Sequence, residues 1–164
     1  MGGVLQLCSH SALDTERLGS ALAAVLVPGD VVILTGELGS GKTAFTRGVA
    51  AGLGSLDAVT SPTFTIMRPH RTAGALLLHL DAYRLDGPDD AEDLGLLELL
   101  DDGAVAVIEW GERIAAALGP DRLEICFHWV DDDVRSLEVR PLGDRWAAAH
   151  QQLLGVLDSW SGPC

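Results

Sequence analysis

The stretch VVILTGELGSGKT, which spans Val31–Thr43, carries the pattern from which the fold class can be inferred. Its first five residues, Val31–Thr35, are apolar and rich in β-branched side chains, which is typical of a buried parallel strand. The next eight, Gly36–Thr43, match the phosphate-binding loop pattern of glycine, any four residues, glycine, lysine and a hydroxyl residue. From Lys42 to Leu53 apolar residues recur at helical spacing. This order of strand, glycine loop and helix is the context in which such a loop binds phosphate.

The composition of the glycine loop suits a nucleotide site. Because glycine has no Cβ, the backbone N–H groups of the loop can approach phosphate oxygens closely. Lys42 brings a compact charge to the β and γ phosphates, and the Thr43 hydroxyl can bind Mg²⁺. Lys42 is also the only lysine of the chain, every other cationic side chain being arginine. We predict that the following residues bind the nucleotide: Gly36, Glu37, Leu38, Gly39, Ser40, Gly41, Lys42 and Thr43.

Two acidic residues at the ends of predicted strands are candidates for catalysis. Glu109 follows the buried strand Val105–Ile108, where a P-loop protein carries its second acidic group, and it can hold Mg²⁺ or orient the attacking water. Asp81 closes the strand Leu76–Leu80 and can position water or support the metal from a distance. We predict a catalytic set of Lys42, Asp81 and Glu109, with Thr43 and Glu109 at the metal. Which carboxylate positions the water stays open.

Residues outside the strands and the glycine loop can complete the site. The loop with Thr60, Ser61 and Thr63 can supply hydroxyls to the γ phosphate, or it can be an ordinary turn. Trp110, directly after Glu109, can pack on the nucleotide or a partner, or can belong to the core. We predict Thr60 and Trp110 as further nucleotide contacts. The five histidines form no pattern of metal ligands.

The remaining apolar patterns predict an α/β fold in one domain, residues 1–164. Helical and strand periodicities alternate along the chain, with two hairpins. We predict a P-loop NTPase-like three-layer sandwich with a mixed, largely parallel central sheet. The predicted helices and hairpins, besides those given above, are a helix over Leu13–Val27, a hairpin over Phe64–Pro69 and Leu76–Leu80, a helix over Ala91–Leu100, a short helix before Gly119, a hairpin over Leu123–Val130 and Val134–Val139, and a terminal helix over Trp146–Trp160, within residues 143–160.

Charge and cysteine usage limit the classes of function. The net charge of −13 lies entirely in residues 81–164, because residues 1–80 contain five acidic and five basic side chains. A chain this acidic lacks the cationic surface that nucleic acids require, which argues against direct binding of tRNA or DNA. Cys8, Cys126 and Cys164 do not have the spacing of a zinc site or a disulfide framework, which favours a reducing cytoplasm. No apolar run is long enough to span a membrane.

Four motifs in this order resemble the TsaE family, also called YjeE. They are Gly36–Thr43 (GELGSGKT), Thr60–Phe64 (TSPTF), His79–Leu85 (HLDAYRL) and Ile108–Arg113 (IEWGER), and the resemblance covers residues 14–130. It implies a cytoplasmic, Mg²⁺-dependent ATPase of tRNA threonylcarbamoyladenosine (t6A) synthesis, and we expect its turnover to be weak without partners. It also implies two protein partners, TsaB and TsaD, with tRNA reached only through them. On this resemblance Thr43 and Glu109 match the Mg²⁺ site, and Asp81 and Trp110 match other functional positions.

Two other classes of function share the same phosphate loop. A small-molecule P-loop kinase would need an acceptor pocket and usually an arginine-bearing lid, but residues 86–102 contain no Arg or Lys. A nucleotide-dependent switch would act through its bound state without significant turnover. ATP is favoured over GTP because the guanine-reading pattern Asn-Lys-x-Asp cannot occur in a chain without asparagine.

Overall fold

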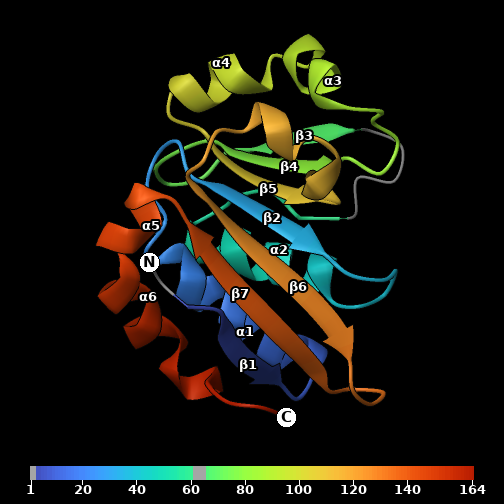
Figure 1. Ribbon diagram of the computed structural model, residues 1–164, viewed down its shortest axis with the longest axis vertical. Coiled ribbons are helices and arrows are strands. Elements are labelled where there is room, and N and C mark those ends of the chain that lie inside the picture. The colour runs from blue at the N-terminus through green and yellow to red at the C-terminus, as the bar shows by residue number, and fades with distance from the viewer. Residues whose placement is uncertain (1–2, 61–65) are drawn as a thin grey trace.

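A seven-stranded mixed sheet forms the centre of the protein (Figure 1). The computed structural model describes residues 3–60 and 66–164. The strand order is β1-β7-β6-β2-β5-β4-β3, with β6, β2, β5 and β4 parallel in the middle and antiparallel pairs at both edges. The strands are β1 (Leu5–Ser9), β2 (Val31–Thr35), β3 (Met67–His70), β4 (Leu77–Asp81), β5 (Val105–Glu109), β6 (Arg122–Trp129) and β7 (Arg135–Leu142).

Helices cover both faces of this sheet and make the three layers that the sequence predicts. Alternate residues of β2 point to opposite faces, so Val32 and Leu34 join one apolar core while Val31 and Ile33 join another. The first core lies under α1 (Ala12–Ala23), α2 (Lys42–Gly52), α5 (Asp144–Ala148) and α6 (His150–Leu157). The second lies under α3 (Pro88–Asp93), α4 (Leu96–Asp101) and the 3₁₀ turns η1 (Gly111–Arg113) and η2 (Ala115–Ala117); a third turn, η3 (Asp158–Trp160), ends α6.

Two predicted helices are each divided in the structure. The prediction of one helix over residues 91–100 is wrong, because Gly95 takes a left-handed backbone conformation (φ 72°) between α3 and α4. The prediction of one helix over residues 146–160 is also wrong, because Ala149 (φ −94°, ψ 6°) separates α5 from α6. The strand β1 was not predicted. It is a short edge strand that pairs with β7 from the far end of the chain, and such pairing has no local signal.

Helices α1 and α2 pack unusually closely through glycines. A Cβ built on Gly19 would collide with the backbone carbonyl of Phe45, and one on Gly48 would collide with that of Glu16. Close contact of the two backbones therefore requires glycine at both positions. As a result, the start of α1 lies beside the start of α2, where the glycine loop ends.

A disulfide joins Cys8 in β1 to Cys164, with their Cα atoms 5.1 Å apart. The spacing of the three cysteines along the sequence does not indicate this pair. The pairing could not be inferred from the sequence, because 156 positions separate the two residues and only the fold brings the C-terminal segment back to β1. There, the Gly162 N–H donates to the Gln6 carbonyl at 2.8 Å. Among the described residues, no helix has the length and apolar character needed to cross a membrane.

Candidate nucleotide-binding site

A cavity of about 310 Å³ opens at the carboxyl ends of β2, β4 and β5. This edge is where open α/β sheets bind ligands, because the loops that leave parallel strands converge there. Three walls can be distinguished: the glycine loop with the start of α2, the ends of β4 and β5, and a wall formed by the start of α1 with the β6–β7 turn. The lining residues are Ser11, Ala12, Thr15, Leu38, Gly39, Gly41, Lys42, Thr43, Ala44, Asp81, Glu109, Trp110, Asp132, Asp133 and Arg135.

The glycine loop adopts a conformation that its glycines permit. Gly36 (φ 141°) lies so close to β6 that a Cβ would come within 2.9 Å of the Phe127 carbonyl oxygen. Gly41 (φ 110°) is the left-handed residue immediately before α2. The loop therefore ends at the N-terminus of α2, where unpaired backbone N–H groups favour an anion. Gly36, Glu37 and Ser40 form the back of the loop and do not line the cavity itself.

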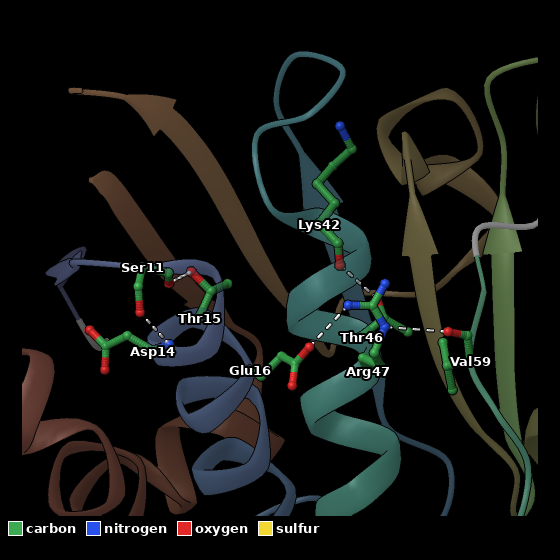
Figure 2. Close-up of polar contacts among 8 residues, drawn as sticks. All are labelled: Ser11, Asp14, Thr15, Glu16, Lys42, Thr46, Arg47 and Val59. Atoms are coloured by element: carbon green, nitrogen blue, oxygen red, sulfur yellow. Dashed lines mark hydrogen bonds and ion pairs between the residues drawn. The ribbon is translucent and has the colours of Figure 1, made fainter. Parts of the chain in front are cut away.

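Lys42 reaches back from α2 into the glycine loop (Figure 2). Its Nζ donates to the carbonyls of Gly36 at 2.6 Å and Glu37 at 3.0 Å, and lies 4.9 Å from the centre of the Trp110 ring. Burial lowers the pKa of Lys42, and the negative charges of Glu109 and Asp81 oppose this effect. Lys42 thus contributes a positive charge at the wall where phosphates would lie.

Arg47 of α2 links this helix to α1 and to the segment that contains Val59 (Figure 2). Its guanidinium donates to the Glu16 carboxylate of α1 at 3.0 Å and to the Val59 carbonyl at 3.4 Å. The segment that leads to Thr60 is therefore tied to both α1 and α2. The Thr60 hydroxyl accepts a hydrogen bond from Arg68 at 3.1 Å, and Thr60 does not line the cavity.

The two predicted acidic residues lie side by side at the second wall. Asp81 and Glu109 are paired in register as the last residues of the parallel strands β4 and β5. The Asp81 carboxylate accepts from the Tyr83 N–H at 3.0 Å. Glu109 is only 6% exposed, and its Oε2 lies 2.7 Å from Nε2 of His79. Two carboxylates therefore line the same cavity as Lys42.

Hydroxyl and carboxylate oxygens at this end of the cavity are a donor set that suits Mg²⁺. Thr43 and Glu109, the two residues that the sequence analysis assigns to a metal, both line the cavity. Among the described residues, no group of three or more His, Cys, Asp or Glu side chains could hold a metal. Mg²⁺ keeps several waters and is usually bound by one or two protein groups together with substrate phosphates.

Trp110 follows Glu109 in a strained conformation. It is the one non-glycine residue with positive φ (60°) in the described ranges 3–60 and 66–164. Its backbone N–H donates to the Leu34 carbonyl at 2.8 Å. Its indole ring packs edge-on against the Tyr83 ring, with the ring centroids 5.4 Å apart. The backbone conformation aims the indole at the cavity, which it lines beside Lys42. Such strain often occurs at functional sites.

The third wall of the cavity, formed by the start of α1 and the β6–β7 turn, has no signal in the sequence. Ser11 caps α1 by accepting from the Asp14 N–H at 3.0 Å, and Thr15 lies one turn further (Figure 2). On the other side, Asp132 and Asp133 belong to the β6–β7 turn, and Arg135 is the first residue of β7. A helix cap and an acidic turn are common structural features, so nothing in their local sequence marks them as part of a site. Ser61 and Thr63 of the predicted hydroxyl loop lie outside the described residues.

The sheet, the glycine loop and the converging side chains define a protein of the P-loop NTPase-like fold. Residues 9–137 match the model of the family described as "Threonylcarbamoyl adenosine biosynthesis protein TsaE". The chain belongs to this TsaE family.

Individual relatives agree with the family match. The chain is 48% identical over 146 residues to the tRNA threonylcarbamoyladenosine biosynthesis protein TsaE of Streptomyces coelicolor, covering 85% of this chain and 98% of the relative. It is 39% identical to the protein of the same name from Bacillus subtilis, covering 85% and 87%. A crystal structure of Bacillus subtilis YdiB superposes with a TM-score of 0.77 at 33% identity and covers 93% of this chain and 95% of that one.

Proposed function

We propose that this chain binds ATP with Mg²⁺ in the cavity and hydrolyses the ATP as the ATPase component of t6A biosynthesis. One observation carries the proposal: Lys42, Thr43, Asp81, Glu109 and Trp110, which come from three separate parts of the sequence, all line one cavity at the end of the central strands. The names of the relatives, which are tRNA threonylcarbamoyladenosine biosynthesis proteins, support the pathway.

The phosphates are proposed to lie on the glycine loop, with backbone N–H groups around them and the Lys42 ammonium beside the β and γ phosphates. Thr43 and Glu109 would hold Mg²⁺ through oxygen atoms. When bound, Mg²⁺ neutralises negative charge on the β and γ phosphates. With the phosphates at this end, the nucleoside extends toward the wall formed by Ser11, Thr15 and the β6–β7 turn.

In the proposed reaction, water attacks the γ phosphorus and the bond between that phosphorus and the β–γ bridging oxygen breaks. The products are ADP and inorganic phosphate, and the proton released from water passes to a carboxylate or to solvent. Asp81 and Glu109 both reach the cavity, so either carboxylate can orient the water. The Trp110 ring lies 4.9 Å from the Lys42 ammonium and lines this end of the cavity.

The proposed partners are TsaB and TsaD, with tRNA contacted only through them. The acidity of residues 81–164 supports this arrangement, because a strongly acidic surface repels the tRNA backbone. No feature of the described structure favours the kinase or the pure switch over this function.

The test is ATP turnover by the purified protein, alone and with TsaB and TsaD from the same organism. We expect slow turnover alone, clear stimulation by the two partners, and loss of both in Lys42→Ala. Glu109→Ala should retain nucleotide binding in the absence of Mg²⁺ and lose turnover. Binding of ATP without any turnover in the presence of the partners would contradict the hydrolytic role and support the switch.

A further inference from the structure

His79 makes a contact that the roles described so far do not explain. It lies in the middle of β4, is fully buried, and places Nε2 at 2.7 Å from Oε2 of Glu109. Its other ring nitrogen, Nδ1, has no hydrogen-bond partner among the described residues. Leaving a buried polar atom without a partner costs stability, so an apolar side chain would suit this core position better. The contact to Glu109 is therefore the feature that the imidazole adds.

The contact acts on one oxygen of the Glu109 carboxylate. Among the described residues, His79 is the one hydrogen-bond partner of that carboxylate, and it occupies Oε2. Glu109 lines the cavity, so Oε1 is the oxygen left for a ligand. Because β4 and β5 are paired in register, with His79 opposite Val107 and Asp81 opposite Glu109, the backbone of both partners is fixed by the sheet. Glu109 is thus held by its backbone in the sheet and by one carboxylate oxygen, which together keep its side chain in a single orientation.

We infer that His79 is a positioning residue that holds Glu109 with Oε1 directed at the Mg²⁺ bound with the nucleotide. The inference rests on the proposed function, in which Glu109 helps to hold this ion. Residues that hydrogen-bond to a metal-ligating side chain orient it, and their loss typically reduces metal affinity about 10- to 100-fold. His79 touches neither the nucleotide nor the ion, so its removal should affect Mg²⁺ and leave Mg²⁺-free nucleotide binding unchanged.

The experiment compares His79→Leu, His79→Gln and His79→Asn with the unmodified protein. Binding of ADP is measured by titration calorimetry without Mg²⁺ and then at a series of Mg²⁺ concentrations, and thermal unfolding of each variant confirms that it is folded. Glutamine can place an amide N–H close to the position of Nε2, whereas asparagine is too short to do so. The two amides thus form a matched pair that differs in reach and keeps the test valid if His79→Leu does not fold.

We expect His79→Leu and His79→Asn to raise the half-saturating Mg²⁺ concentration about 10- to 100-fold, and His79→Gln to restore most of the loss. None of them should change the affinity for ADP without Mg²⁺. In a Glu109→Ala background, His79→Leu should have no further effect.

Two results would overturn the inference, and they can be told apart. If Glu109→Ala shifts the Mg²⁺ dependence while the histidine variants do not, Glu109 holds the ion without help from His79 and only this inference fails. If Glu109→Ala itself leaves the Mg²⁺ dependence unchanged, the metal site of the proposed function fails and the inference fails with it.

Discussion

Lys42 shows how one side chain can be suited to one position. Lys42 is 5% exposed. Its ammonium lies within 3.0 Å of two loop carbonyls and 4.9 Å from the centre of the Trp110 ring. A guanidinium is planar and delocalised, and it does not reproduce the contacts of a compact ammonium. We therefore expect Lys42→Arg to keep the charge but to weaken ATP binding at least about 10-fold, nearly as much as Lys42→Ala. Equilibrium binding of a fluorescent ATP analogue measures this, and wild-type affinity in Lys42→Arg would refute it.

His70 should make stability depend on pH. It is 1% exposed, and burial, followed by the nearby His79, lowers its pKa. A lowered pKa in the folded state means that the unfolded chain binds more protons between that pKa and about 6.5. Stability should therefore fall as the pH drops below about 6.5, and the fall should be shallower in His70→Phe. Urea denaturation at several pH values tests this; parallel curves for the two proteins would contradict it.

At the scale of elements, the contact of α1 with α2 depends on glycine. A methyl group on Gly48 would collide with the Glu16 backbone, so the helices would have to separate. We expect Gly48→Ala to lower the free energy of unfolding by about 1–3 kcal/mol, as overpacking does. Gly155 in α6 is a matched control because a Cβ there meets nothing within 4 Å. Gly155→Ala should be neutral or stabilising by up to about 1 kcal/mol, and equal losses in both variants would disprove the packing argument.

Elements with a strong local pattern could be predicted, and elements set by long-range contacts could not. The apolar run of β2 and the helix after the glycine loop match their predicted positions closely. The division between α3 and α4 was missed because apolar spacing continues across Gly95, and glycine is tolerated within a helix at modest cost. The edge strand β1 depends on pairing with β7, whose residues lie more than 120 positions away.

At the scale of the whole molecule, the disulfide joins the two ends of the chain. Cross-linking Cys8 to Cys164 closes a loop of 156 positions, which restricts the unfolded chain strongly. We expect Cys164→Ser, or treatment with a reductant, to lower the free energy of unfolding by about 2–5 kcal/mol. Cys126→Ser is the control, since Cys126 is a free thiol. Calorimetry of the oxidised protein with and without reductant measures the effect, and identical unfolding temperatures would contradict the prediction.

The arrangement of the whole fold determines which parts of the site could be predicted from the sequence. Lys42, Asp81 and Glu109 each follow a buried strand or a glycine loop, so parallel-sheet geometry alone brings them together. The wall made by Ser11, Thr15 and Arg135 combines segments about 120 positions apart, which only the complete fold places side by side.

The most direct test of nucleotide binding is calorimetric titration of the protein with ADP and with a non-hydrolysable ATP analogue, with and without Mg²⁺. We expect one binding site per chain. Binding should be tighter with Mg²⁺ and at least about tenfold weaker in Lys42→Ala, because one ammonium contact to phosphate is worth more than about 1.4 kcal/mol. Binding that is absent, or that is unchanged by Lys42→Ala and by Mg²⁺, would show that this cavity is not a nucleotide site.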